Sequence, residues 1–164
     1  MSTIHRFERS QSIERPLSEV FAFFSDATNL EAITPPFLHF GIVTPTPIAM
    51  RAGAQIEYRL ALWGVPLRWR TRISVWEPDV RFVDEQIDGP YAYWHHLHEF
   101  RADGEATLMR DELSYSLPFG PLGGIAHAVW VKRQLRTIFD YRARAIERLL
   151  PARDAGGSER RHVA

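Results

Sequence analysis

The chain contains no cysteine among its 164 residues. A disulfide framework, a thiol nucleophile and a thiolate-held metal are therefore excluded. An excess of charge of either sign is also missing, because 20 Lys and Arg residues balance 20 Asp and Glu residues. Such a chain has no general attraction for nucleic acid or for an anionic membrane, so no nucleic-acid partner is expected.

Long apolar runs and several well-known motifs are absent as well. No apolar stretch approaches the roughly 20 residues that span a bilayer, and residues 1–14 lack the apolar core of a signal peptide. We therefore expect a cytoplasmic protein without stable membrane insertion. A P-loop, a Gly-x-Gly-x-x-Gly sequence and a Gly-x-Ser-x-Gly elbow are missing, so neither a nucleotide cofactor nor serine-type hydrolysis is indicated, and no cofactor is expected.

What is present is a set of elements that fits one domain, which we place at residues 1–151, with a disordered tail at 152–164. Apolar alternation predicts a first strand, followed by a helix that begins near Pro16 and a second short helix that contains Leu30 and Ile33. A glycine-rich turn at 120–124 precedes a long helix that ends near Leu150. Strands are expected over residues 4–13, 37–44, 55–63 and 67–76, with three more between residues 82 and 115.

This order of elements predicts an α+β fold. An antiparallel sheet of about six to seven strands, if strongly curved, would wrap around the long C-terminal helix. A cavity would then remain between the sheet and that helix.

The stretch from residue 82 to residue 115 is the most informative part of the sequence. One face of its three strands would combine large apolar side chains with acids, an amide and imidazoles, and such groups are costly to bury unless they pair or meet a ligand. The turn positions place Asp84 opposite His96, and Asp111 opposite either His96 or His98. The polar members of this face are Asp84, Gln86, His96, His98 and Asp111.

Three interpretations of this polar face remain open. It is a buried hydrogen-bond network, or it orients the polar end of an apolar ligand, or it is a catalytic set of His96, His98, Asp84 and Asp111. In the last case a carboxylate-held histidine acts as general base in a cyclisation or dehydration. A metal site from His96, His98, Asp84 and Asp111 is a weaker alternative: the two histidines point the same way and could chelate an ion, but the sequence defines no third ligand, so no metal is expected.

The aromatic content, 12% of the chain, suits either a cavity wall or, as is more common, an aromatic-rich core. Trp76 is opposite in phase to the inward residues of its strand, which suggests either a dimer contact or a strand-end position, so we expect a monomer or a homodimer. The residues expected to contact a ligand are Tyr58, Trp69, Phe82, Gln86, Trp94, Phe100, Met109, Leu113, Tyr115 and Phe139.

Several segments of the sequence are similar to those of a known superfamily, namely residues 16–24, 30–36, 82–86, 89–91 and 94–100, with Asp111, Tyr115 and Pro118. Through them the sequence resembles the START/Bet v 1-like (SRPBCC) superfamily, and within it a bacterial ligand-binding, cyclase- or dehydrase-like group. The resemblance implies the helix-grip fold over roughly residues 3–150 and a hydrophobic or amphipathic ligand that is lipid-, polyketide- or aromatic-like. A cofactor-independent polyketide cyclase or dehydratase with a His–Asp pair, or an interaction module with a structural cavity, are the alternatives, so enzymatic activity stays open.

Overall fold

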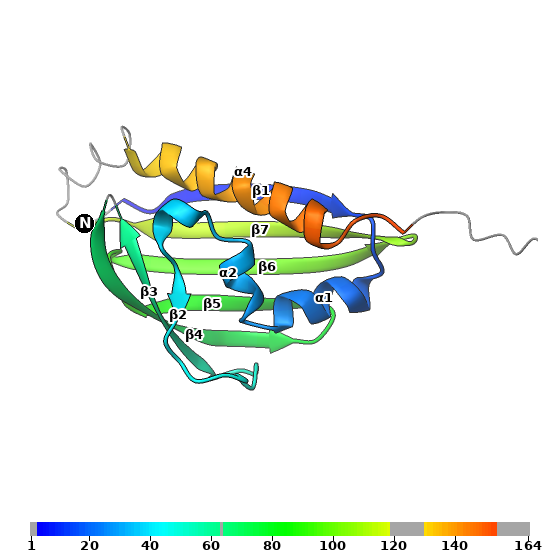
Figure 1. The fold of residues 1–164 in the computed structure, drawn as a ribbon, viewed down its shortest axis with the longest axis horizontal. Helices are drawn as coiled ribbons and strands as arrows, with labels where there is room; N and C mark the ends of the chain where they lie inside the picture. The colour runs from blue at the N-terminus through cyan, green and yellow to red at the C-terminus, as the bar shows by residue number, and fades with distance from the viewer. Residues whose placement is uncertain (1–2, 63, 119–129, 154–164) are drawn as a thin grey trace, which may run out of the picture.

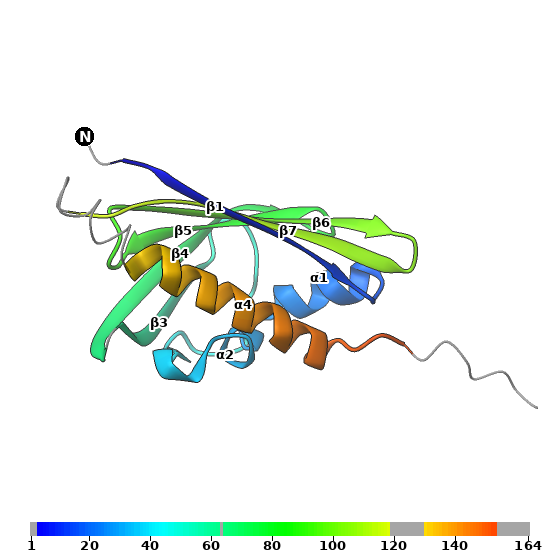
Figure 2. The same cartoon turned by 90° about the horizontal axis from the view of Figure 1, so that it is seen from above.

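One seven-stranded antiparallel sheet carries its helices on a single face (Figure 1 and Figure 2). The structure, a computed structural model, describes residues 3–62, 64–118 and 130–153. The predicted α+β helix-grip architecture, with a curved sheet and a long C-terminal helix, is confirmed. The elements are β1 (His5–Ile13), α1 (Leu17–Ser25), α2 (Asn29–Ala32), the 3-10 turn η1 (Pro36–Leu38), β2 (Gly41–Ile42), β3 (Gln55–Leu62), β4 (Val65–Glu77), β5 (Arg81–Asp88), β6 (Tyr93–Asp103), β7 (Ala106–Ser116) and α4 (Lys132–Leu149).

The strand order is β1-β7-β6-β5-β4-β3-β2, so β3 to β7 form a meander in which each strand pairs with the next along the chain. Tight turns make this possible. Gly104, in the turn between β6 and β7, has a φ of 62°, and a Cβ built there would meet no atom within 4 Å. Glycine is therefore needed for its backbone conformation and not for space. This turn sets the pairing of β6 with β7 that positions the site.

The inner face of β4 changes phase at an irregularity in its pairing with β5. The register slips between Ile73 and Val75, so that the residues beyond this point no longer follow the simple alternation. The ring of Trp76 lies 5.3 Å from that of Phe21 and 5.5 Å from that of Phe82, measured between centroids. The prediction that Trp76 is opposite in phase to the inward set is wrong, and its use as evidence for a dimer contact falls with it.

The region that follows α2 also differs from the prediction. Instead of a strand over 37–44, the chain forms the η1 turn and then only the two-residue strand β2. Pro36 suits the first position of a helical turn, and His39 ends that turn in the left-handed region with a φ of 46°. The predicted glycine-rich turn at 120–124 and residues 154–164 of the predicted tail lie outside the described residues.

The helices complete a core at one end of the sheet. The apolar residues of α1 recur at helical spacing, and Val20, Phe21 and Phe24 are buried as expected. Phe21 and Phe24 each place their ring 5.4 Å from that of Phe100 on β6. Each such buried side chain contributes about 1.5–3 kcal/mol to folding. Because this cluster fills the space between α1 and the sheet, any cavity has to lie further along the strands.

The long helix α4 crosses the same face of the sheet over β1 and β7 (Figure 1). Arg9 on β1 forms an ion pair with Asp140 on α4, and the Gln11 amide donates a hydrogen bond of 3.0 Å to the Ala143 carbonyl. These contacts hold the helix beside the edge strand. Among the described residues, no helix combines the length and the apolar character needed to cross a membrane.

Candidate functional site

A cavity of about 160 Å³ lies between the inner face of the sheet, α4 and the segment from α1 to η1. Its wall is mostly aromatic and aliphatic, with a polar side formed by β5 and β6. Five of the ten residues predicted to contact a ligand line this cavity, namely Tyr58, Trp69, Phe82, Trp94 and Phe139. Their role in binding stays a prediction, but their placement agrees with it.

The other five predicted contact residues lie elsewhere. The side-chain amide of Gln86 donates a 2.7 Å hydrogen bond to the carbonyl of Tyr91 and accepts one of 3.3 Å from its N–H, so it closes the turn between β5 and β6. Phe100 and Met109 belong to the core cluster beneath α1. Leu113 and Tyr115 belong to a separate cluster beneath the start of α4.

The sequence reasoning did not assign several cavity residues to the site. Leu38 ends the η1 turn, and Phe40 and Met50 lie outside the helices and strands, so no regular alternation marks these residues as inward-facing. Arg142 was detectable, because it falls on the inward stripe of α4, where a charged residue is unexpected. Its guanidinium carbon lies 5.1 Å from the centroid of the Phe139 ring, a cation–π contact, and its Nε is buried without a hydrogen-bond partner in the described structure.

The polar side of the cavity is a cluster of two acids and two imidazoles from three adjacent strands. Asp84 pairs with His96 across β5 and β6, as predicted, and His98 pairs with Asp111 across β6 and β7, which is one of the two predicted registers. His96 itself stands opposite Leu113. The Asp111 side chain nevertheless reaches His96 diagonally, so all four groups meet.

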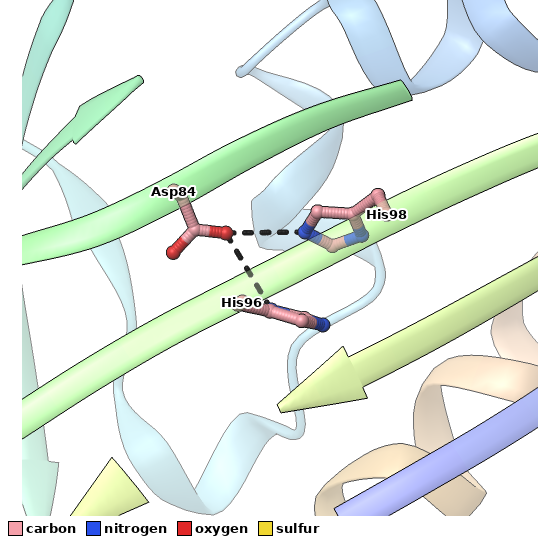
Figure 3. A group of neighbouring side chains, drawn as sticks. All are labelled: Asp84, His96 and His98. Atoms are coloured by element: carbon pink, nitrogen blue, oxygen red, sulfur yellow. Dashed lines mark hydrogen bonds and ion pairs between the residues drawn. The ribbon is translucent and has the colours of Figure 1, made fainter. Parts of the chain in front are cut away.

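The distances in this cluster place each imidazole between the two carboxylates, of which Asp84 is drawn with both rings in Figure 3. Asp84 Oδ2 lies 3.1 Å from His98 Nε2 and 3.5 Å from His96 Nδ1. Asp111 Oδ1 lies 3.1 Å from His96 Nε2 and 2.7 Å from His98 Nδ1. The last contact is close but poorly aligned, so it is an ion-pair contact without the geometry of a hydrogen bond. The other oxygen of Asp84 accepts a 3.3 Å hydrogen bond from the Trp94 indole.

The four side chains of the cluster differ in whether they line the cavity. His96 and His98 are 4% and 5% exposed, and both line the cavity together with Asp84. Asp111 is buried and is not part of the cavity wall, so it contacts the imidazoles from behind. The groups that a ligand can reach are therefore Asp84 and the two histidines.

The pKa values of the two histidines are shifted in opposite directions. Burial acts against the charged form of His98, but the close contacts of this ring with the Asp111 and Asp84 carboxylates outweigh burial and raise the pKa of the imidazole. Burial and the charge of His98 lower the pKa of His96. Burial would raise the pKa of Asp84 and of Asp111, but both imidazoles hold these values below the ordinary range. The cluster thus favours one imidazolium, one neutral imidazole and two carboxylates.

This arrangement can serve three kinds of chemistry. It can bind the polar end of a molecule, it offers a neutral imidazole held by a carboxylate as a base, and Asp84, His96 and His98 can each supply one metal-ligand atom. Burial, together with the charge of Asp84, raises the pKa of Tyr58, so its hydroxyl is a neutral group in the same wall. It donates a 3.3 Å hydrogen bond to Thr71.

Comparison with solved structures finds the same fold in several proteins. TTHA0849 from Thermus thermophilus is 20% identical over 89% of this chain and 97% of its own, with a TM-score of 0.64. The major latex-like protein 151 of Panax ginseng is 11% identical over 90% and 98% of the two chains, with a TM-score of 0.67. A START superfamily protein of Mycobacterium smegmatis is 13% identical over 89% and 97%, with a TM-score of 0.64. At these identities the likeness concerns the fold.

A search among curated proteins finds no match to this sequence. Residues 13–141 match the family described as polyketide cyclase / dehydrase and lipid transport. Polyketides and lipids are largely hydrophobic, so binding of hydrophobic small molecules is common to the activities in that description. Because the match extends over most of the chain and the fold agrees, the chain belongs to the polyketide cyclase / dehydrase and lipid transport family of the START/Bet v 1-like (SRPBCC) superfamily.

Proposed function

We propose that the protein binds one apolar or amphipathic small molecule, lipid-, polyketide- or aromatic-like, in its cavity. The observation that carries this proposal is the shape and chemistry of the wall, which is mostly aromatic and aliphatic, with its acid and imidazole groups gathered at Asp84, His96 and His98. A cavity of about 150 Å³ with an apolar lining accepts benzene. The cavity of about 160 Å³ thus has room for an aromatic ring or for part of a longer chain.

Two buried donors support an oxygen-bearing polar end for this ligand. Trp69 Nε1 and Arg142 Nε are buried and have no hydrogen-bond partner in the described structure, and both residues line the cavity. Buried donors in proteins almost always have a partner. A ligand with a carbonyl, carboxylate or hydroxyl oxygen would supply one, while its apolar body covers the aromatic wall. Each CH₂ group buried in this way contributes about 0.8 kcal/mol.

A cavity-filling substitution tests the binding site. Ile138 on α4 lines the cavity and is half-buried, so Ile138→Trp should fill the space without a large loss of stability. Thr137→Trp, at the exposed neighbouring position, is the matched control. The probe is the amphipathic fluorophore 1-anilinonaphthalene-8-sulfonate, whose affinity should fall at least tenfold, about 1.4 kcal/mol, in Ile138→Trp alone. Equal affinities of the two variants would contradict binding in the cavity. Native mass spectrometry of the purified protein would identify any retained ligand by its excess mass.

A cofactor-independent cyclase or dehydratase is the second candidate, and one observation favours it. The lowered pKa of His96 keeps this imidazole neutral, and the ring lies in the cavity wall with Nε2 against Asp111, as a general base requires. His96→Gln should then abolish turnover of a poly-β-ketone substrate while affinity for the fluorophore stays within about twofold. A parallel loss of turnover and affinity would assign His96 to ligand binding and not to the role of general base.

The remaining expectations from the sequence stay predictions. An interaction module would require a partner that is lost on substitution of exposed Arg68 or Arg136 with the cavity unchanged. A cytoplasmic location, the absence of a nucleic-acid partner, and a monomeric or homodimeric state belong to the same group. Gel filtration with light scattering would decide the oligomeric state.

A further inference from the structure

Three atoms that commonly bind metal ions converge on one point of the cavity wall (Figure 3). Asp84, His96 and His98 each offer one such atom, and the three atoms lie within 4.8 Å of one another. Asp84 Oδ2 is 3.5 Å from His96 Nδ1 and 3.1 Å from His98 Nε2. Ligand atoms that share an ion at bond lengths of about 2.1 Å are about 3.0–3.5 Å apart in octahedral or tetrahedral geometry. Both measured distances fall in this range.

Each of the three side chains also has a second polar atom, on the side away from the proposed ion, and these atoms contact Trp94 or Asp111. The Trp94 indole donates to Asp84 Oδ1 at 3.3 Å, which leaves Oδ2 directed at the imidazoles. Asp111 Oδ1 contacts the opposite nitrogen of each ring, 3.1 Å from His96 Nε2 and 2.7 Å from His98 Nδ1. A carboxylate behind a metal-binding imidazole is the usual outer support of such sites, because it fixes the ring and its tautomer.

The charges of the cluster also suit a divalent cation. The carboxylates of Asp84 and Asp111 bring two negative charges into a largely buried place. One divalent ion between neutral imidazoles balances these two negative charges completely. The cavity wall also contains the Arg142 guanidinium and the neutral Tyr58 hydroxyl. Arg142 adds one positive charge and so balances only part of the pair.

We propose that Asp84, His96 and His98 bind one first-row divalent transition-metal ion, of the Zn²⁺ or Fe²⁺ kind, with Asp111 as the positioning residue for both imidazoles. Two imidazoles and one carboxylate suit such ions and leave coordination positions open. Here the open positions face the cavity. Asp84 is the third ligand that the sequence alone did not define, although its position opposite His96 was predicted. The proposal does not depend on the organic ligand proposed above.

The test begins with wild-type protein freed of metal by a chelator. Titration with Co²⁺, followed by its visible absorption, and with Zn²⁺, followed by calorimetry, should show one ion per chain. His96→Gln and His98→Gln should each abolish or strongly weaken this site. Asp111→Asn should weaken it by about 10- to 100-fold, as loss of an outer carboxylate does. His95→Gln is the matched control, because His95 is adjacent in β6 and is absent from the cavity wall, and it should leave binding unchanged.

Several results would overturn the proposal. Wild-type protein that takes up no more Co²⁺ or Zn²⁺ than the His96→Gln/His98→Gln double variant has no such site, and this comparison begins from the intact chain. Equal weakening by His95→Gln and His96→Gln would assign the binding to histidines at the surface. Circular dichroism of each variant checks the fold. Fluorophore binding by metal-free wild type and Ile138→Trp is measured in parallel, so that a failed metal site and a failed organic-ligand site are told apart.

Discussion

The Asp111→Asn substitution measures how much the buried carboxylate between the two imidazoles stabilises the fold. The variant keeps the shape of the side chain and removes its charge. In the wild type, Oδ1 lies 3.1 Å from His96 Nε2 and 2.7 Å from His98 Nδ1, in a residue that is 7% exposed. The perturbation therefore acts on two charge-assisted contacts and leaves the packing almost unchanged.

The expected loss follows from that geometry. Removing one partner of a buried charge pair costs about 3–5 kcal/mol, because the other partner remains buried. Asn retains one acceptor oxygen, so we expect a somewhat smaller loss of stability, about 2–4 kcal/mol near neutral pH. In a chain of this length each kcal/mol shifts the melting temperature by about 2–4 °C. The variant should melt about 5–15 °C below the wild type.

The pH dependence of the loss gives the sharper assay. The pKa of Asp111 is lowered in the folded state, so its stabilisation is present above the unfolded value near 3.9 and is lost as pH falls toward the folded value. The pKa of His98 is raised, so its stabilisation is present below about 6.5 and is lost as pH rises through the folded value. The difference between wild type and variant should thus be widest near pH 5 and smaller at about pH 3.5 and 9.

Urea denaturation in the presence of a chelator, followed by tryptophan fluorescence, measures this difference without a contribution from metal. Glu112→Gln is the control, because Glu112 is adjacent on β7, half-exposed and paired with Arg110 at 3.0 Å. It should cost no more than about 1 kcal/mol. A loss below about 0.5 kcal/mol in Asp111→Asn near pH 5, or one that is equal at all pH values, would refute the reasoning.

Three further substitutions probe the frame around the site. Trp76→Ala removes a ring that packs on Phe21 and should cost about 2–3 kcal/mol in urea denaturation; a cost under about 1 kcal/mol would place this ring outside the core. Gly104→Ala adds a methyl group to open space at a φ of 62°, so only backbone strain of about 1 kcal/mol should appear in the melting temperature, and an unchanged value would contradict this. Gln86→Ala removes both hydrogen bonds to Tyr91, so amide exchange in the β5–β6 turn should become faster, whereas unchanged exchange would show that the turn closes without them.

The sequence was sufficient to predict the pairing of strands where that pairing is set by local features. Alternation of apolar and polar residues and the glycines of the turns placed Asp84 opposite His96, and the structure confirms it. For Asp111 the sequence left two possible cross-strand partners, His96 and His98, because a turn that is one residue longer or shorter alters the pairing. The structure selects His98 as its partner.

Two aspects of the site could not be read from the pattern. Phe100 lies on β6 on the same face as His98, yet it packs under α1 and not in the cavity, since alternation does not tell where along the strand a helix will lie. The slip between Ile73 and Val75 has no signal in residue type, so the inward position of Trp76 was missed. Both depend on contacts between segments far apart in the chain.

The same slip in β4 has a consequence for how members of such a family can diverge. On one side of it, Trp69 and Ile73 belong to the cavity wall, and on the other side Trp76 belongs to the packed cluster under α1. The two sets lie on one strand, but the first is constrained by the shape of the cavity and the second by packing against α1. Substitutions in the first set can change which molecule fits the cavity, while the second set continues to pack against α1. Ligand preference can therefore change during evolution without a loss of fold stability.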